Sequence, residues 1–184
     1  MGLRGRVKAT LDGLQPRSIS AGYLREAAVL MPVFERAGEP YFLLTLRTQE
    51  VETHKGQISF PGGMRHGDED LETTALRETC EEIGLDHGHV EILGRFHDYV
   101  SSTDYRVTTF TGYIREPFEP IPQPTEVADV LEVPFSIFHD PARLRVEKMT
   151  LKDRLVDVLF YTYGTHQIWG LTARIIRDFL AALR

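Results

Sequence analysis

The sequence contains a single cysteine, Cys80, and it has no long apolar run. One cysteine cannot form an intrachain disulfide, which is typical of proteins from a reducing compartment. The amino terminus is positively charged but lacks the apolar stretch of a signal peptide, and no segment approaches the roughly 20 apolar residues that a membrane-spanning helix needs. We therefore expect a cytoplasmic protein.

Basic side chains are in the minority. The chain has 21 Lys and Arg against 27 Asp and Glu, so its formal net charge is -6. This charge opposes nonspecific binding to nucleic acid or to an anionic membrane, and we expect neither partner. An anionic ligand would need local basic residues or a cation. With 184 residues, 42% of them apolar, the chain is expected to fold as one domain.

Strand-like segments outnumber helical ones. We expect strands or strand-rich segments at residues 27–34, 41–48, 89–101, 105–114, 126–138, 145–151 and 154–163. Pro32 inside the first of them indicates an edge or a bulge. Helices are expected from Asp68 or Asp70 to about Ile83, where Gly84 stops the helix, and over residues 171–184. The four prolines of residues 115–126 predict an extended surface loop.

This order of segments predicts an α/β fold in which helices cover a mixed sheet. We expect residues 1–26 to be an N-terminal extension that packs on the domain, and residues 27–184 to form the domain itself.

The helix expected near residues 71–84 carries an unusual group of carboxylates. At about 100° per residue, Glu78, Glu81 and Glu82 lie opposite the apolar side, where Cys80 is expected to pack in the core. Like charges at i and i+4 are destabilising, the helix dipole disfavours anions in the last turns, and no lysine lies at i+4. A solvated polar face is the alternative interpretation. A cation such as Mg²⁺ or Mn²⁺, which prefers oxygen ligands, explains the arrangement better.

Seven positions in this region match a known pattern, and they are Gly63, Glu69, Arg77, Glu78, Glu81, Glu82 and Gly84. Together with Leu85 they resemble the Nudix box, so the chain is identified as a member of the Nudix hydrolase family by resemblance. Upstream, "LLTLRT" and "GQISFPGG" resemble the signature of the coenzyme A pyrophosphatase branch. A further arginine of that signature falls at Glu52 here, and His54 or Lys55 could replace the missing cation.

The resemblance implies an α/β/α sandwich and a role for each matching residue. Glu78 and Glu82 would be the main Mg²⁺ or Mn²⁺ ligands, Glu81 a ligand or the general base, and the Gly62 carbonyl a further ligand. Arg77 and Glu69 would hold the catalytic loop and helix together.

Three positions, one of them within the Nudix-box match, are candidates for substrate binding. Arg47 and Lys55 are candidates for the substrate phosphates, and Gly63 would allow close backbone approach. Glu126, which follows the proline loop, would bind metal or activate water; a surface carboxylate is the alternative.

The implied reaction is hydrolysis of coenzyme A or its thioesters to 3',5'-ADP and 4'-phosphopantetheine or its acyl derivative. Because Glu52 breaks the subfamily signature, ADP-ribose, a dinucleotide or a nucleoside triphosphate stays open as the substrate. A noncatalytic nucleotide-binding regulatory module is the alternative from another class, although such a module would be expected to lose the glutamates kept here. A homodimer is left open.

Overall fold

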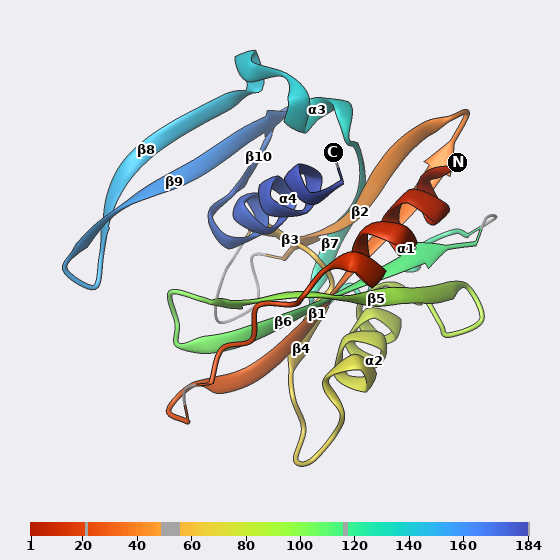
Figure 1. Cartoon of the computed structure of the whole chain (residues 1–184), viewed down its shortest axis with the longest axis horizontal. Helices are drawn as coiled ribbons and strands as arrows, with labels where there is room; N and C mark the ends of the chain where they lie inside the picture. Colours follow the sequence, from red (N-terminus) through yellow and green to blue (C-terminus); the bar gives the residue numbers. More distant parts are fainter. Residues whose placement is uncertain (21, 49–55, 116–117, 184) are drawn as a thin grey trace.

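A seven-stranded mixed sheet forms the centre of the computed structural model, which describes residues 1–20, 22–48, 56–115 and 118–183 (Figure 1). The strand order is β3-β2-β1-β6-β5, with β4 paired to β1 and β7 paired to β2. Strands β1 and β6 are parallel, and the other pairs are antiparallel. These strands are β1 (Arg25–Arg36), β2 (Glu39–Arg47), β3 (Ile58–Ser59), β4 (Gly62–Met64), β5 (Val90–Val100), β6 (Tyr105–Ile114) and β7 (Val127–Pro134). The predicted mixed sheet is confirmed.

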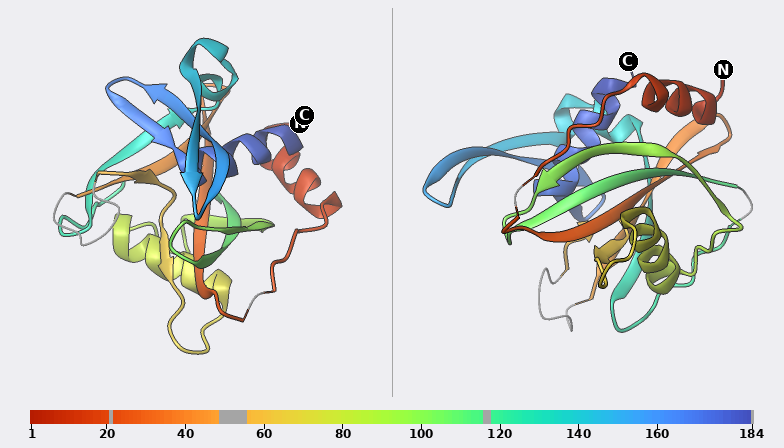
Figure 2. Two further views of the ribbon diagram at one scale, coloured as in Figure 1. Left: turned by 90° about the vertical axis from the view of Figure 1, so that its left-hand side faces the viewer. Right: turned by 60° about the horizontal axis from the view of Figure 1, so that its bottom comes forward.

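Helices cover both faces of this sheet. Helix α2 (Leu71–Ile83) lies on one face, and α1 (Leu3–Gly13) and α4 (Gly170–Ala182) lie on the other (Figures 1 and 2). A short helix, α3 (Ser136–His139), and a 3₁₀ turn, η1 (Pro141–Arg143), follow β7. None of the helices in the described ranges is both long and apolar enough to cross a membrane. The layers agree with the expected α/β architecture.

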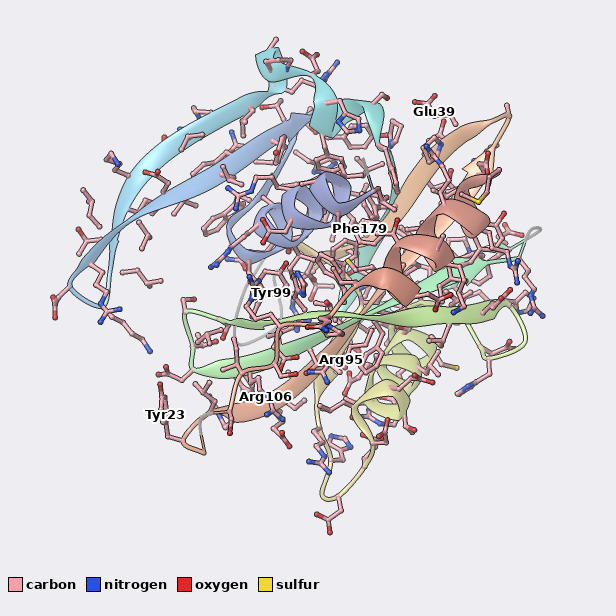
Figure 3. All side chains as sticks on the ribbon, viewed as in Figure 1. Tyr23, Glu39, Arg95, Tyr99, Arg106 and Phe179 are labelled. Atoms are coloured by element: carbon pink, nitrogen blue, oxygen red, sulfur yellow. The ribbon has the colours of Figure 1, made fainter. Side chains whose placement is uncertain are left out.

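Two hydrophobic clusters hold the layers together. One packs α1 and α4 against the sheet and includes Phe42, Phe96 and Phe179, whose rings meet edge-to-face; Figure 3 labels Phe179 on α4. The other packs α2 against the opposite face through Phe34 and Ile83. Because both faces of the sheet are buried, the strand ends and α2 have fixed positions relative to one another.

A second sheet of three strands, in the order β10-β9-β8, was not predicted as a separate unit. It contains β8 (Leu144–Leu151), β9 (Arg154–Tyr163) and β10 (His166–Trp169). The strands expected at residues 145–151 and 154–163 are confirmed as β8 and β9, which pair antiparallel. Strand β10 was missed because four residues show too little periodicity to identify a strand.

The prediction that Pro32 marks an edge or a bulge was wrong. Strand β1 is central, and Pro32 lies opposite Gly112 in the parallel pairing with β6. On its other side β1 pairs with β4 over residues 27–29 and with β2 over residues 33–36. Pro32 therefore lies in the interval between these two partners, where a missing backbone N–H group is tolerated.

The N-terminal segment packs on the sheet. Helix α1, which the sequence analysis did not predict, buries Leu3, Val7 and Leu11. The chain then crosses β5, where the Ile19 amide donates to the buried Asp98 carboxylate at 3.0 Å. The boundary between an extension and a domain at residues 26 and 27 stays a prediction.

Candidate active site

Helix α2 begins and ends where its sequence predicts. The Asp70 side chain accepts a hydrogen bond from the Glu72 amide at 2.9 Å and caps the first turn. Gly84 ends the helix with a left-handed φ of 71°, and its amide donates to the Cys80 carbonyl at 2.9 Å. The two caps therefore set the bounds of α2 at Leu71 and Ile83.

Glu82 is buried between α2 and the sheet, with only 3% of its surface exposed. The expectation that the three glutamates share the helix's outer side is wrong for Glu82, and Glu78 is largely covered as well, with 15% of its side chain exposed. Only Glu81, with 61% exposed, faces the solvent. Glycine at position 63 in β4 leaves room for the covered Glu78 side chain, because a Cβ atom there would lie 2.4 Å from the Glu78 carboxylate.

The placement of Cys80 is a second correction. Its side chain is exposed, whereas the sequence analysis placed it in the core. The buried side of α2 includes Ala75, Thr79 and Glu82, so it is rotated away from Cys80 toward the glutamate. Hydrophobicity alone could not predict this rotation, since it brings a carboxylate inward.

The Glu82 carboxylate has few partners for a buried anion. It accepts a hydrogen bond from the Gly62 amide at 3.2 Å, and Arg47 Nη1 lies 3.6 Å from its other oxygen. Burial raises the pKa of Glu82 to about 8 from an ordinary value of 4.5; the Gly62 amide and Arg47 lower it, and the charges of Glu78 and Glu126 raise it further. The predicted residues Arg47, Glu78 and Glu126 are therefore gathered around Glu82.

Arg47 and Glu126 reach this site from adjacent strands. Arg47 ends β2 and pairs with Val127 at the start of β7, and the Thr48 amide donates to the Glu126 carbonyl at 3.0 Å. The Nε atom of Arg47 is buried and has no hydrogen-bond partner within the described part of the chain. Lys55, like Glu52 and His54, lies outside the described residues.

Arg77 connects four parts of the Nudix-box pattern. Its guanidinium donates to both oxygens of Glu69, at 3.0 and 3.2 Å, and to Glu78 at 2.8 Å. It also donates to Glu81 and to the carbonyl of Met64, each at 3.2 Å. The hydrogen bonds from Arg77 lower the pKa of Glu69 to about 2, against burial. This geometry agrees with the orienting role expected for Arg77 and Glu69, which stays a prediction.

The proline loop makes contacts with α2 that the sequence did not reveal. The amide of Gln123 donates to the Glu82 carbonyl, and the amide of Ile121 donates to the Ile83 carbonyl, both at 2.8 Å. These bonds satisfy carbonyl groups that the end of α2 leaves without an intrahelical partner. The loop that leads to Glu126 is therefore attached to the last turn of the glutamate helix.

The residues of the site fit a hard divalent cation. Their side-chain ligand atoms are all carboxylate oxygens, and burial disfavours the charged form of Glu82 despite the Gly62 amide and Arg47, so a bound cation would stabilise that form. Within the described ranges no three His, Cys, Asp or Glu side chains surround a common point. Glu82 and Glu78 are the residues that would hold the metal.

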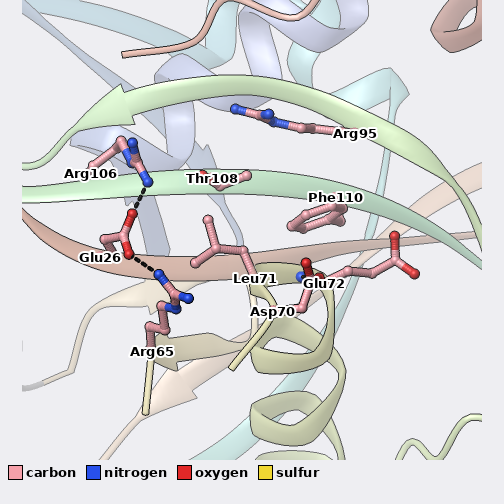
Figure 4. A pocket seen from close by; sticks show the side chains of 9 residues that line it. All are labelled: Glu26, Arg65, Asp70, Leu71, Glu72, Arg95, Arg106, Thr108 and Phe110. Carbon is pink, nitrogen blue, oxygen red and sulfur yellow. Dashed lines mark hydrogen bonds and ion pairs between the residues drawn. The ribbon is translucent and has the colours of Figure 1, made fainter. Parts of the chain in front are cut away.

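A separate hollow of about 440 Å³ lies at the other end of α2 (Figure 4). Its wall includes Arg65 and Arg106, and the Glu26 carboxylate bridges these two guanidinium groups. Three arginines and three carboxylates line the hollow, so the lining side chains carry no net charge. None of the predicted site residues contributes to it.

Comparison with known proteins identifies the family. The NUDIX domain family matches residues 24–158. The chain belongs to the Nudix family. Nudix hydrolases act on pyrophosphate bonds and generally use divalent metal ions, so the prediction of a Nudix enzyme is confirmed.

The relatives support this assignment at the level of the whole domain. The Nudix hydrolase NudL of Photorhabdus laumondii, described as uncharacterized, is 37% identical over 155 residues, covering 84% of this chain and 82% of the relative. Nudix hydrolase 22 of Arabidopsis thaliana, described as chloroplastic, is 38% identical over 160 residues, or 83% of this chain. The match spans only about half, 53%, of the plant protein's length.

Solved structures support the fold alone. The Ap4A hydrolase of C. elegans, in a binary complex, superposes with a TM-score of 0.54 at 20% identity, over 60% of this chain and 80% of the other. A MutT/nudix family protein of Enterococcus faecalis superposes with a TM-score of 0.52 at 17% identity, over 98% of this chain and 69% of the other.

Proposed function

We propose that this Nudix hydrolase cleaves the pyrophosphate of coenzyme A or its thioesters with Mg²⁺ or Mn²⁺, giving 3',5'-ADP and 4'-phosphopantetheine or its acyl derivative. One observation carries the chemistry: a buried carboxylate, Glu82, lies beside two further carboxylates and an arginine whose Nε atom has no partner among the described residues. The choice of coenzyme A is supported by the resemblance of residues 43–48 and 56–63 to the coenzyme A pyrophosphatase signature.

Glu78 and Glu82 would hold the metal ion between α2 and β4. When bound, the metal supplies positive charge that offsets repulsion between anions and lowers the pKa of a coordinated water. Gly62 contributes the amide that orients Glu82, and Gly63 leaves room for Glu78. The Gly62 carbonyl stays a candidate for an additional ligand.

Arg47 is placed to bind a substrate phosphate. Its Nε donor is unpartnered in the described part of the chain, and its Nη1 atom lies beside Glu82. A guanidinium can donate to two phosphate oxygens at once, so a phosphate next to the metal would satisfy the buried donor. Lys55 remains a candidate from the sequence alone.

Glu126 is the preferred general base. Its charge raises the pKa of Glu82, which supports a role near the two glutamates that would hold the metal, whereas Glu81 faces solvent and is bound to Arg77. A carboxylate near the metal, but outside the pair that holds it, is suited to accept a proton from the attacking water.

Parallel assays with coenzyme A, ADP-ribose, a dinucleotide and a nucleoside triphosphate, each with Mg²⁺ and Mn²⁺, test the proposal. We expect the highest kcat/KM with coenzyme A, and mass spectrometry of products formed in ¹⁸O water will identify the bond cleaved. Equal activity on coenzyme A and ADP-ribose would rule out coenzyme A as the preferred substrate and favour a broader Nudix pyrophosphatase. Tight nucleotide binding without turnover by any substrate would favour a regulatory module.

A further inference from the structure

The hairpin of β8 and β9, residues 144–163 and here called the arm, exposes many apolar side chains. Ten large hydrophobic side chains are exposed in the described residues, and half of them belong to the arm: Leu144, Val146, Met149, Leu151 and Leu155. Such a concentration on one projecting element is typical of a surface that binds another protein. The arm contains none of the residues assigned to the active site.

Strand β8 is the outer edge of the arm. Among the described residues it pairs only with β9, and Figure 1 shows it as the strand farthest from the main sheet. Seven of its eight residues are exposed, and Glu147 is half-buried. An eight-residue edge strand with apolar side chains and no proline has free backbone donors and acceptors that can pair with another strand.

The arm is held in place before any partner binds. Lys152 at its tip forms an ion pair with Asp104, which lies in the turn between β5 and β6. Across the hairpin, Lys148 Nζ lies 2.9 Å from the Asp157 carboxylate. A preorganised edge loses less conformational entropy on association than a mobile one.

We propose that β8 pairs antiparallel with β8 of a second copy of this chain, about a two-fold axis. Such an axis, perpendicular to the sheet, keeps each side chain on its own face. A residue of β8 must therefore lie opposite itself at the axis, with its neighbours paired around it. Each possible register is therefore defined by the one residue of β8 that lies at the axis.

The charges of β8 select Val146 as the central residue. Arg145 and Glu147 form an ion pair with each other along β8. In the register centred on Val146 each also lies opposite its counterpart of unlike charge in the partner copy, Arg145 opposite Glu147 and, by symmetry, Glu147 opposite Arg145. Centring the pairing on Arg145, Glu147 or Lys148 places two like charges directly opposite each other, which is destabilising. Charge complementarity therefore favours a dimer of identical chains with Val146 facing Val146 across the axis.

Sedimentation equilibrium of the full-length protein, from micromolar to millimolar concentration, tests the proposal. We expect a monomer–dimer equilibrium in the wild type. Arg145→Glu and Glu147→Arg should each weaken it by roughly tenfold or more, because two attractive cross-strand pairs become repulsive. An equimolar mixture of the two variants should recover association, since each copy then presents the charges that the other needs. Arg154→Glu, the same charge change on the inner strand, is the matched control and should leave the dimer unchanged.

Thermal unfolding of each variant shows whether the chain is folded, and activity on coenzyme A shows whether the active site is intact. A wild type that stays monomeric at millimolar concentration would overturn the proposal. So would a dimer that both charge reversals leave unchanged, or one that the mixture fails to restore. These outcomes do not depend on the substrate, so failure here is distinct from failure of the proposed function.

Discussion

Alanine at Gly63 is expected to damage the active site while leaving the fold intact. The new Cβ atom would lie 2.4 Å from the Glu78 carboxylate, which is the far end of a flexible side chain. Glu78 can rotate away, at the cost of its 2.8 Å hydrogen bond to Arg77. That ion pair is partly exposed, so its loss should cost about 1 kcal/mol or less. Gly→Ala also reduces the conformational entropy of the unfolded chain, which favours the folded state by about 0.4–1 kcal/mol and offsets part of this loss.

The neighbouring glycine provides the matched comparison. Gly62 has a φ of 149°, and a Cβ atom there would lie 2.3 Å from the backbone oxygen of Ala28. Backbone in β1 cannot rotate away as a side chain can. We expect Gly62→Ala to cost about 3 kcal/mol or more through strain and the separation of β4 from β1. This corresponds to a fall in Tm of roughly 6–12 °C for a chain of this length.

The two variants are compared by calorimetry, by titration with Mn²⁺ and by hydrolysis of coenzyme A. Gly63→Ala should unfold within a few degrees of the wild type, bind metal more weakly and lose at least about tenfold in kcat/KM, equivalent to about 1.4 kcal/mol. Gly62→Ala should show the large loss of stability. If Gly63→Ala kept both its metal affinity and its turnover, Glu78 could not be a metal ligand next to β4.

Three further predictions concern the carboxylates and their partner. In metal-free protein the folded pKa of Glu82, about 8, exceeds its ordinary value of 4.5. The free energy of unfolding, measured by urea denaturation, should therefore fall by on the order of 5 kcal/mol as pH rises from about 4.5 to 8. Glu82→Gln should remove this pH dependence. Arg77→Lys cannot keep the paired bonds to Glu69 and should lower kcat more than it raises KM. Because the pKa of Glu69 is lowered to about 2 from 4.5, the contribution of that pair to wild-type stability, measured by acid denaturation, should fall progressively below pH 4.5 and be lost near pH 2. Glu126→Gln should reduce kcat by at least about tenfold without preventing Mn²⁺ binding, and a smaller decrease would exclude Glu126 as the base.

The sequence predicted the elements whose determinants are local. The cap at Asp70 and the stop at Gly84 define α2 with residues that act on their own neighbours. Strand-like apolar runs likewise predicted the strands that form β1, β2, β8 and β9. Helix α1 was missed because its sequence, "LRGRVKATLDG", buries only three apolar side chains and lacks a side-chain cap at Gly2.

The site depends on contacts that no local pattern contains. The spacing of the glutamates indicated a cation, but not that Glu82 is buried, because the rotation of α2 is set by its packing against the sheet. The proximity of Glu126 to Glu82 depends on the pairing of β7 with β2 and on the attachment of the proline loop to α2. Such contacts arise only when the strands have been arranged in a sheet.

Electron paramagnetic resonance of bound Mn²⁺, recorded on samples that also hydrolyse coenzyme A, tests the glutamate site most directly. In the wild type we expect Mn²⁺ to bind and turnover to follow its occupancy. In Glu82→Gln, which should stay folded, both the bound signal and the turnover should be lost. A Glu82→Gln variant that binds Mn²⁺ with unchanged affinity and hydrolyses coenzyme A at the wild-type rate would contradict the assignment of the buried carboxylate as the metal ligand.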